Sequence, residues 1–267
     1  MTSLHVRVPI RQGFTPLLKS PQSGMRWLNF GVLRLSRGET YTFPPLADRE
    51  TGLVLLGGTA DVEGETFHWR SLGERENVFD GRATAIYLPP GVGYTVRALT
   101  DLEAAVITAP ASKGAPPTVI RPQDVIVHER RGKPTFLRDV HDIIVDQVPA
   151  DMLLVGETFN YPGEWSSYPP HKHDIHRPPE EVELEEVYFY KIDPPQGFGL
   201  QRIYAPDRGF DETYLVLNDD LVLIPWGYHP VAAAPGYRLY YLWALAGKAR
   251  VIQPYVDPEH AWIMEGR

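Results

Sequence analysis

The sequence contains no cysteine among its 267 residues. This absence excludes disulfide bonds, cysteine-ligated zinc and iron–sulfur clusters, so any metal ion would be held by histidine, aspartate or glutamate. No segment approaches the roughly 18 consecutive apolar residues that a membrane-spanning helix needs. The first ten residues, MTSLHVRVPI, do not have the apolar run of an export signal. We therefore expect a cytoplasmic protein without a membrane partner.

Positive charge is also in short supply. The chain has 26 Lys and Arg residues against 34 Asp and Glu residues, a net charge of −8. A mildly acidic surface repels nucleic acid, and the densest basic run, HERRGK at 128–133, is short. The sequence has no helix-turn-helix pattern either. These features disfavour a nucleic-acid partner and a role as a transcriptional regulator.

Helical periodicity is weak along the whole chain, whereas short β-type runs separated by Pro and Gly are frequent. The chain has 26 Pro and 23 Gly, scattered between apolar runs, which favours many short strands joined by tight turns. Asn218-Asp219-Asp220, flanked by YLVL and LVLIP, is typical of a hairpin turn. We predict an all-β protein with few helices, and the expected strands are Trp27–Leu35, Gly52–Leu56, Ala85–Leu88, Ala104–Thr108, Met152–Phe159, Glu186–Lys191, Gly199–Tyr204, Thr213–Leu217, Leu221–Pro225 and Tyr237–Ala246.

An internal repeat divides the chain into two similar halves. The segment GETYTFPP at 38–45 aligns with GEWSSYPP at 163–170, and YLPPG at 87–91 aligns with LIPWG at 223–227. The two offsets differ because residues 175–185 form an insertion in the second half. We therefore predict two β-barrel or jelly-roll domains, 1–110 and 135–267, joined by a linker at 111–134.

Histidines of the second half are absent from the first. His171 aligns with Leu46, His173 with Asp48 and His229 with Gly93, so the fold itself does not require these imidazoles. On a strand, two residues at i and i+2 face the same side, and both rings can then reach one ion.

Together with Glu186 at the start of EVYFYKI, the three histidines predict a metal site. Three imidazoles and one carboxylate suit zinc, manganese, iron, cobalt or nickel as a divalent ion. The alternative is that these histidines make ordinary hydrogen bonds. The set predicted to bind the metal is His171, His173, Glu186 and His229.

Neighbouring polar residues compete for roles at this site. His176 lies in the charged insertion, where a solvated loop is the simpler interpretation. Glu185 competes with Glu186, but with Glu186 inward, strand alternation also turns Tyr188 and Tyr190 inward. These tyrosines either offer hydroxyl groups to a ligand or simply line the barrel.

Several segments carry a resemblance to a known family. The spacing G-x₇-H-x-H, a following Glu and a later His resemble the cupin superfamily, and the duplication resembles a bicupin with one degenerate half. The segments PPHKHD, EEVYFYKI, GFGLQRIY and PWGYHPVAAAPGYRLYYLWALAG resemble the 5-deoxy-glucuronate isomerases of myo-inositol catabolism over almost the whole chain. The ketol-isomerases of pectin breakdown share the H-x-H-D…EVYFY pattern, but their segment between the second His and the Glu is shorter.

The resemblance implies a metal-dependent isomerase that converts 5-deoxy-D-glucuronate, an aldose, into the ketose 2-deoxy-5-keto-D-gluconate. It carries the family's four metal ligands onto the residues named above, with one zinc or manganese ion per chain as the implied cofactor. A proton carrier among Tyr188, Tyr190 and Glu186, or a hydride shift without a base, would complete the reaction. Alternatives are the pectin-pathway ketol-isomerase, an iron-dependent dioxygenase, a storage protein and a non-catalytic sugar-binding cupin.

Arg202, within GLQRIY, is the first candidate to bind the substrate carboxylate, although a surface position would explain it equally well. Arg177 and Lys172 are weaker candidates because one lies in the insertion and the other should face away from the metal. The expected partner is a small sugar acid. Apolar edges such as LYYLWALAG suit a homo-oligomer as well as a buried strand.

Overall fold

Short apolar runs bounded by Pro and Gly form strands throughout residues 3–265, the part of the chain that the computed structural model describes. None of the helices in this range is long and apolar enough to cross a membrane. The prediction of an all-β protein with few helices is confirmed. The helical pieces are η1 (Pro122–Asp124), η2 (Pro206–Arg208) and α1 (Trp262–Glu265).

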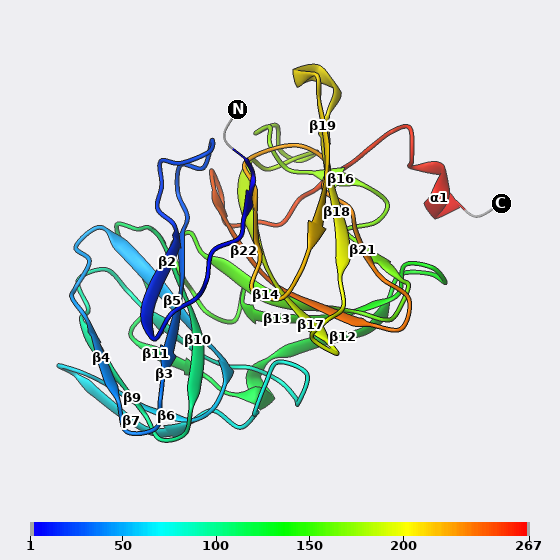
Figure 1. Ribbon diagram of the computed structural model, residues 1–267. Coiled ribbons are helices and arrows are strands. Elements are labelled where there is room, and N and C mark those ends of the chain that lie inside the picture. Colours follow the sequence, from blue (N-terminus) through cyan, green and yellow to red (C-terminus); the bar gives the residue numbers. More distant parts are fainter. Residues whose placement is uncertain (1–2, 266–267) are drawn as a thin grey trace.

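The strands gather in two lobes, one blue to cyan and one green to red (Figure 1). In the first lobe a six-stranded sheet has the order β11-β8-β5-β10-β3-β2, and a four-stranded sheet has the order β4-β9-β6-β7. All their pairings are antiparallel. The strands are β2 (Gly13–Leu18), β3 (Asn29–Leu35), β4 (Thr40–Phe43), β5 (Arg49–Gly57), β6 (Ala60–Gly64), β7 (Phe67–Leu72), β8 (Thr84–Leu88), β9 (Tyr94–Ala98), β10 (Leu102–Pro110) and β11 (Thr118–Ile120).

The second lobe repeats this plan. A seven-stranded sheet has the order β1-β20-β17-β22-β14-β13-β12, a four-stranded sheet the order β15-β21-β18-β19, and β16 pairs with β23. The strands are β1 (His5–Val6), β12 (Ile126–Arg131), β13 (Arg138–Ile144), β14 (Leu154–Asn160), β15 (Trp165–Ser166), β16 (His171–Lys172), β17 (Leu184–Asp193), β18 (Gly199–Ala205), β19 (Phe210–Val216), β20 (Leu221–Ile224), β21 (Val231–Ala233), β22 (Arg238–Gly247) and β23 (Tyr255–Val256).

One strand from the start of the chain joins a sheet of the second lobe, and the predicted linker contributes strands to both lobes. Strand β1, at the start of the chain, pairs with β20 of the second lobe. The segment predicted as a linker contains β11, which pairs with β8, and β12, which pairs with β13. The division into 1–110, 111–134 and 135–267 stays a prediction.

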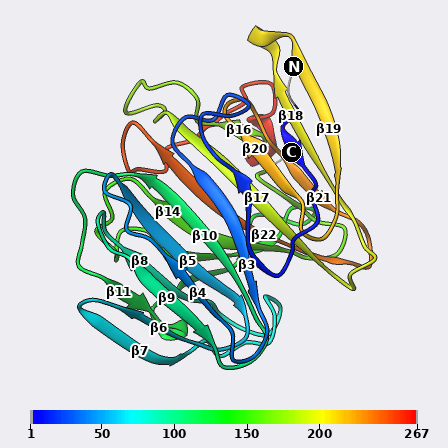
Figure 2. The same cartoon turned by 60° about the vertical axis from the view of Figure 1, so that its left-hand side comes forward.

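The two large sheets pack face to face, as the two views show (Figures 1 and 2). Their facing side chains belong to one apolar core, in which the ring centroids of Phe30 and Phe189 are 5.4 Å apart. Because β5 and β17 are covered on both faces, they have near-continuous apolar sequences, LVLL and VYFY. A second apolar core fills the inside of the first barrel.

The ladder registers confirm the internal repeat. Glu186 pairs with Ile224 of β20 and with Leu245 of β22. In the first lobe Thr51 pairs with Leu88 of β8 and with Thr108 of β10. Thr51 therefore occupies the position in the first lobe that Glu186 occupies in the second. In the same way, Glu50 corresponds to Glu185.

A reciprocal pair of carboxylates ties the lobes together. Buried Glu185 of the second lobe accepts hydrogen bonds from the backbone N–H groups of residues 26–28, at 2.6–2.7 Å. Buried Glu50 of the first lobe accepts from the N–H groups of residues 151–153, at 2.7–2.8 Å. Each lobe therefore supplies the acceptor for three consecutive amide groups of the other.

The hairpin prediction at 218–220 is wrong. A tight turn does form, with Asp219 in the left-handed region (φ 68°) and the Asp220 N–H donating to the Leu217 carbonyl. However, β19 pairs with β18 in the small sheet, while β20 pairs with β17 in the large sheet. The turn therefore carries the chain from one sheet of the barrel to the other.

Candidate metal centre

Three elements of the second barrel bring the predicted ligands together. Glu186 lies near the start of β17, His173 directly follows β16, and His229 lies in the turn between β20 and β21. This turn requires Gly227, whose φ is 88° and whose Cα hydrogen faces the Tyr204 carbonyl oxygen; a Cβ there would lie 2.9 Å from that oxygen. The tight turn expected from the PWGYH segment therefore points His229 inward.

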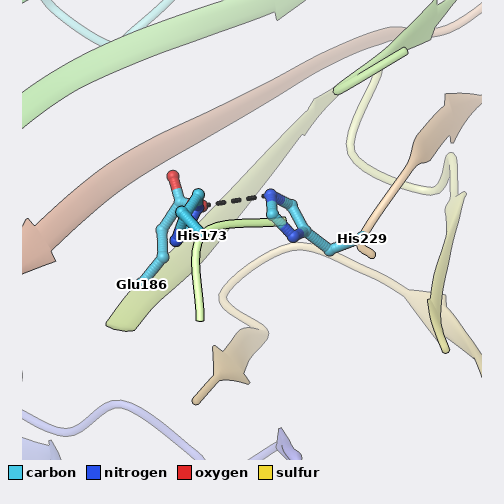
Figure 3. Close-up of side chains that lie close together, drawn as sticks. All are labelled: His173, Glu186 and His229. Atoms are coloured by element: carbon cyan, nitrogen blue, oxygen red, sulfur yellow. Dashed lines mark hydrogen bonds and ion pairs between the residues drawn. The ribbon is translucent and has the colours of Figure 1, made fainter. Parts of the chain in front are cut away.

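The three side chains point toward one another (Figure 3). The Nε2 atom of His173 lies 3.1 Å from Oε2 of Glu186, and the Nε2 atom of His229 lies 3.3 Å from the same oxygen. The ligand-type atoms of this trio lie within 4.8 Å of one another, and all three residues are buried. A single cation can therefore contact all three groups.

Backbone carbonyls orient both imidazoles. Nδ1 of His173 lies 2.8 Å from the Leu184 carbonyl oxygen, and Nδ1 of His229 lies 2.9 Å from the Gly227 carbonyl oxygen. An Nδ1–H that donates to a carbonyl leaves the Nε2 lone pair free, the tautomer found in metal-ligating histidines. In this tautomer both lone pairs face the Glu186 carboxylate, an arrangement that a cation would stabilise.

The electrostatics of the trio agree with that arrangement. Burial by itself would raise the pKa of Glu186, but the neighbouring imidazoles of His173 and His229 outweigh it and lower this pKa to about 2. The carboxyl group is therefore ionised at neutral pH. Nε2 of His229 is buried without a hydrogen-bond partner, and such an orphaned polar atom calls for a ligand. The residues fit a divalent ion.

His171 lies beside this trio. Its ring centroid is 4.8 Å from that of His229 and 6.3 Å from that of His173. The compact group of ligand atoms consists of His173, Glu186 and His229 and does not include His171. Burial, together with the neighbouring imidazoles, lowers the pKa of His171 and keeps its ring neutral. Its role as a fourth ligand stays a proposal.

A cavity of about 330 Å³ opens beside the trio. Its wall combines imidazole and carboxylate groups, hydroxyl groups and cationic groups, a composition suited to a small polar molecule. The lining residues are Arg131, Arg138, Val140, Asp142, Thr158, Ser167, His171, His173, Glu186, Tyr188, Tyr241, Trp243, Leu245, Ile252 and Pro254.

The two predicted tyrosines differ in their surroundings. Tyr188 lines the cavity, and its hydroxyl oxygen lies 2.8 Å from Oγ of Ser167. Burial and the nearby Glu186 charge raise the pKa of Tyr188, so the hydroxyl keeps its proton. Tyr190 is buried away from the cavity, and its hydroxyl donates to Oε1 of Gln201 at 2.7 Å.

Arg202 does not reach this cavity. It lies on β18, where Nε and Nη2 donate to the Asp211 carboxylate at 2.8 and 2.7 Å, and it borders a different cavity near His260. Lys172 and Arg177 pair with Glu181, and His176 is exposed. The structure therefore places all three candidate cations for the substrate carboxylate in other contacts.

Arg138 is the cation that sequence reasoning missed. It lies at the start of β13, lines the cavity, and donates through Nη1 to the carbonyl oxygens of Arg131 and Phe136. Burial lowers the pKa of Arg138, with the charge of Arg131 adding to this effect. No carboxylate among the described residues pairs with it. The alternation of RDVHDII places Arg138, Val140 and Asp142 on one face of the strand, but it does not show that this face points into the cavity.

Comparison with known proteins identifies the family. The model of the KduI/IolB family matches residues 9–263. The chain belongs to this family. A relative, the 5-deoxy-glucuronate isomerase of Geobacillus thermodenitrificans, is 43% identical over 260 residues, which cover 97% of this chain and 94% of the relative. The chain is an isomerase, as the sequence predicts.

Solved structures support the same assignment. The crystal structure of an IolB-like protein from Salmonella typhimurium LT2 has a TM-score of 0.93 and 40% identity, with coverage of 98% of this chain and 100% of the other. A cupin 2 conserved barrel domain protein from Leptotrichia buccalis has a TM-score of 0.51 and 12% identity, covering 90% of this chain and 92% of the other. The cupin architecture expected for this KduI/IolB member is confirmed.

Proposed function

We propose that this isomerase converts 5-deoxy-D-glucuronate into 2-deoxy-5-keto-D-gluconate, as a step of inositol degradation, with one divalent ion at His171, His173, Glu186 and His229. The observation that supports metal binding is the buried Nε2 atom of His229, which has no hydrogen-bond partner. It points toward the ionised Glu186 carboxylate, beside the oriented imidazole of His173. The relatives named 5-deoxy-glucuronate isomerase support the substrate. Zinc and manganese are the ions we expect first.

In this proposal the metal ion and the residues around it have different roles. When bound, a divalent ion polarises a carbonyl group and stabilises negative charge that develops on oxygen. Glu186 supplies the negative charge that holds the cation, while the Leu184 and Gly227 carbonyls keep both imidazoles in the ligating tautomer. The apolar wall of Trp243 and Leu245 excludes part of the water from this end of the cavity.

Arg138 takes over the role predicted for Arg202. A sugar acid bound with its carbonyl end at the trio presents its carboxylate elsewhere on the cavity wall, and Arg138 is a half-buried cation there without an acidic partner among the described residues. A guanidinium binds a carboxylate through two parallel hydrogen bonds, which also orients the substrate. Arg131, on the same wall, adds positive charge.

Tyr188 is the group proposed to hold a proton at the reacting end. Tyr188 lines the cavity, and its hydroxyl shares a hydrogen bond with Ser167 and stays protonated, so it can donate to a substrate oxygen as charge develops there. Tyr190 has no place in this proposal because its hydroxyl is already bound to Gln201. The cytoplasmic location and a homo-oligomeric state stay predictions.

Metal analysis combined with a substrate assay tests this proposal. Purified protein should contain about one divalent ion per chain, and His229→Ala and His173→Ala should each lose most of it. His176→Ala, at an exposed histidine of the insertion, serves as the matched control and should retain it. Protein that binds no metal, or variants that keep their full metal content, would remove the metal site from the proposal.

The assay separates the candidate substrates. The chain should isomerise 5-deoxy-D-glucuronate far faster than the deoxy-keto-uronate of pectin breakdown. The reverse preference would favour the pectin-pathway reaction, and metal binding without turnover of either would favour a sugar-binding role. Running the reaction in deuterated water distinguishes proton transfer, which incorporates solvent deuterium, from a hydride shift, which does not.

A further inference from the structure

The insertion at 175–185, which the first half of the repeat lacks, forms a closed loop beside the metal centre. Its two ends meet at His173, whose carbonyl oxygen accepts a hydrogen bond from the Leu184 N–H at 2.7 Å and whose Nδ1 lies 2.8 Å from the Leu184 carbonyl oxygen. Within the loop Glu181 is fully buried, whereas the preceding Glu180 is exposed. A buried carboxylate needs partners, and those of Glu181 show what the loop holds.

The Glu181 carboxylate fixes the start of the loop. Its Oε1 atom accepts hydrogen bonds from the backbone N–H groups of Asp174 and Ile175, at 2.8 and 3.1 Å, and from Nζ of Lys172 at 3.0 Å. Its Oε2 atom lies 3.1 Å from Nη2 of Arg177. Two cations and two backbone amides therefore surround the buried charge, as a stable buried carboxylate requires.

Asp174 extends from this loop to the turn that carries His229. Its side chain pairs with Lys172, and its Oδ2 atom accepts a hydrogen bond from the Gly227 N–H at 2.9 Å. The carbonyl oxygen of the same glycine lies 2.9 Å from Nδ1 of His229. Asp174 therefore holds the residue whose carbonyl group orients the His229 imidazole.

The first barrel forms the same turn without such a side chain. Gly91, which aligns with Gly227, also has a positive φ of 81°, and its N–H donates to the carbonyl oxygen of Leu46 at 2.7 Å. The histidine position of this turn is occupied by Gly93. A backbone acceptor is therefore sufficient for the turn itself. The barrel that has the histidine uses the carboxylate of Asp174 instead, which indicates a role beyond folding.

We propose that Asp174 and Glu181 are positioning residues that orient the His229 imidazole for metal binding, and that they act in series. Glu181 fixes Asp174, and Asp174 fixes Gly227. The inference rests on the metal site of the proposed function. The compact group of ligand atoms contains neither carboxylate, so both act from outside it. Partners that orient a metal ligand in this way typically change metal affinity by about 10-fold to 100-fold.

Zinc titration of the complete protein, in competition with a chromophoric chelator, tests the arrangement. Asp174→Ala should weaken Zn²⁺ binding by about 10-fold to 100-fold. Asp174→Asn, whose amide oxygen still accepts from the Gly227 N–H, should recover most of this loss. Glu181→Ala should also weaken binding, whereas Glu180→Ala, at the exposed neighbour, is the matched control and should not. Because the two residues act in series, the double variant should bind Zn²⁺ no more weakly than Asp174→Ala alone.

NMR of the metal-free protein gives a readout that does not depend on metal content. In the original chain Nδ1 of His229 should carry the proton, and the Gly227 amide should exchange slowly with solvent. Asp174→Ala should accelerate this exchange by about tenfold or more and populate the second tautomer of His229. Asp174→Asn should preserve both signals, which a general loss of stability would not do.

Unchanged Zn²⁺ affinity in Asp174→Ala would overturn the inference, as would losses that multiply in the double variant. Equal losses in Asp174→Asn and Asp174→Ala would overturn it too, because the hydrogen bond to Gly227 would then have no effect. A protein that binds no Zn²⁺ but shows the expected Gly227 and His229 signals would remove the metal ion from the proposed function and still support the positioning role.

Discussion

Arg138 is a guanidinium in a cavity wall whose only described hydrogen bonds go to two backbone carbonyls. Arg202, in contrast, is already paired with Asp211 at the surface, with 42% of its side chain exposed. A charge that lacks a partner in the free protein gains most from a charged ligand. The two arginines therefore give opposite expectations for substrate binding.

Replacing Arg138 by Met should raise KM and lower kcat/KM by about 30-fold to 100-fold, because a charge-assisted hydrogen bond is worth about 2–3 kcal/mol. Arg202→Met is the matched control and should leave KM unchanged. Steady-state kinetics on 5-deoxy-D-glucuronate measures both. An effect of Arg202→Met that equals or exceeds that of Arg138→Met would contradict the assignment.

The two tyrosines give a second pair of variants. Tyr188→Phe should lower kcat by about 100-fold, the lower end of the usual contribution of general acid catalysis, with little change in metal content. Tyr190→Phe should leave kcat close to the original value and cost about 1 kcal/mol of stability, because Oε1 of Gln201 loses its buried donor. Equal losses of kcat in both variants would argue against a special role for Tyr188.

At the residue scale the sequence predicts the side chains that gather around Glu186 better than it predicts the cation in the cavity wall. The spacing of His171, His173, Glu186 and His229, and the absence of the three histidines from the other half of the repeat, are visible without coordinates. Arg138 could not be selected, because an alternating strand shows which residues share a face but not whether that face points inward. This choice depends on how β12, β13 and β14 close the barrel.

At the scale of elements, backbone amides near the lobe boundary depend on carboxylates that arrive from the opposite lobe. Glu185, at the start of β17, serves residues 26–28 just before β3. The neighbouring Glu183 makes only a surface ion pair with Arg26. Two glutamates separated by one residue therefore differ widely in their expected contribution to stability.

Glu185→Ala should lower the free energy of unfolding by about 3 kcal/mol or more, because up to three N–H groups lose a buried acceptor at 1–3 kcal/mol each. Glu183→Ala should cost no more than about 0.5 kcal/mol, as is usual for an exposed ion pair. Chemical denaturation followed by tryptophan fluorescence compares the two. Similar losses in both variants would show that the Glu185 hydrogen bonds are not important for stability.

The elements themselves follow closely from local sequence. Ten predicted strands correspond to β3, β5, β8, β10, β14, β17, β18, β19, β20 and β22. The hairpin prediction failed because turn residues at 218–220 specify a reversal of the chain but not which partner each flanking strand will choose. Pairing of β20 with β17 and β1 is decided by burial between the lobes, a long-range effect.

For the whole molecule, a network of four charged side chains crosses the lobe boundary. Arg34 and Glu103 of the first lobe contact Lys191 and Asp219 of the second, with Nη2 of Arg34 lying 2.6 Å from both Glu103 and Asp219. Burial by itself would raise the pKa of Asp219, but the charges and hydrogen bonds of Lys191 and Arg34 lower it overall. The network therefore depends on an ionised Asp219.

Because the pKa of Asp219 is lower in the folded chain, its contribution is present above the unfolded pKa of about 4 and is lost as the pH falls below that value. We expect about 1 kcal/mol from this residue. Asp219→Asn, which tolerates the same left-handed backbone, should remove that contribution at pH 7 and make stability less sensitive to acid. Urea unfolding between neutral and acid pH measures the difference; parallel curves for both proteins would contradict it.

The Glu50 contacts carry a consequence for how such a duplicated chain can evolve. After a gene duplication, the copy that loses its metal ligands would ordinarily be free to shrink or disappear. Here Glu50 of the first lobe accepts hydrogen bonds from three backbone N–H groups of the second lobe. Deleting the first lobe would therefore destabilise the half that retains the histidines. Mutation could therefore remove the metal ligands of the first barrel but not the barrel itself. The smallest active unit of this enzyme should remain the chain with both barrels.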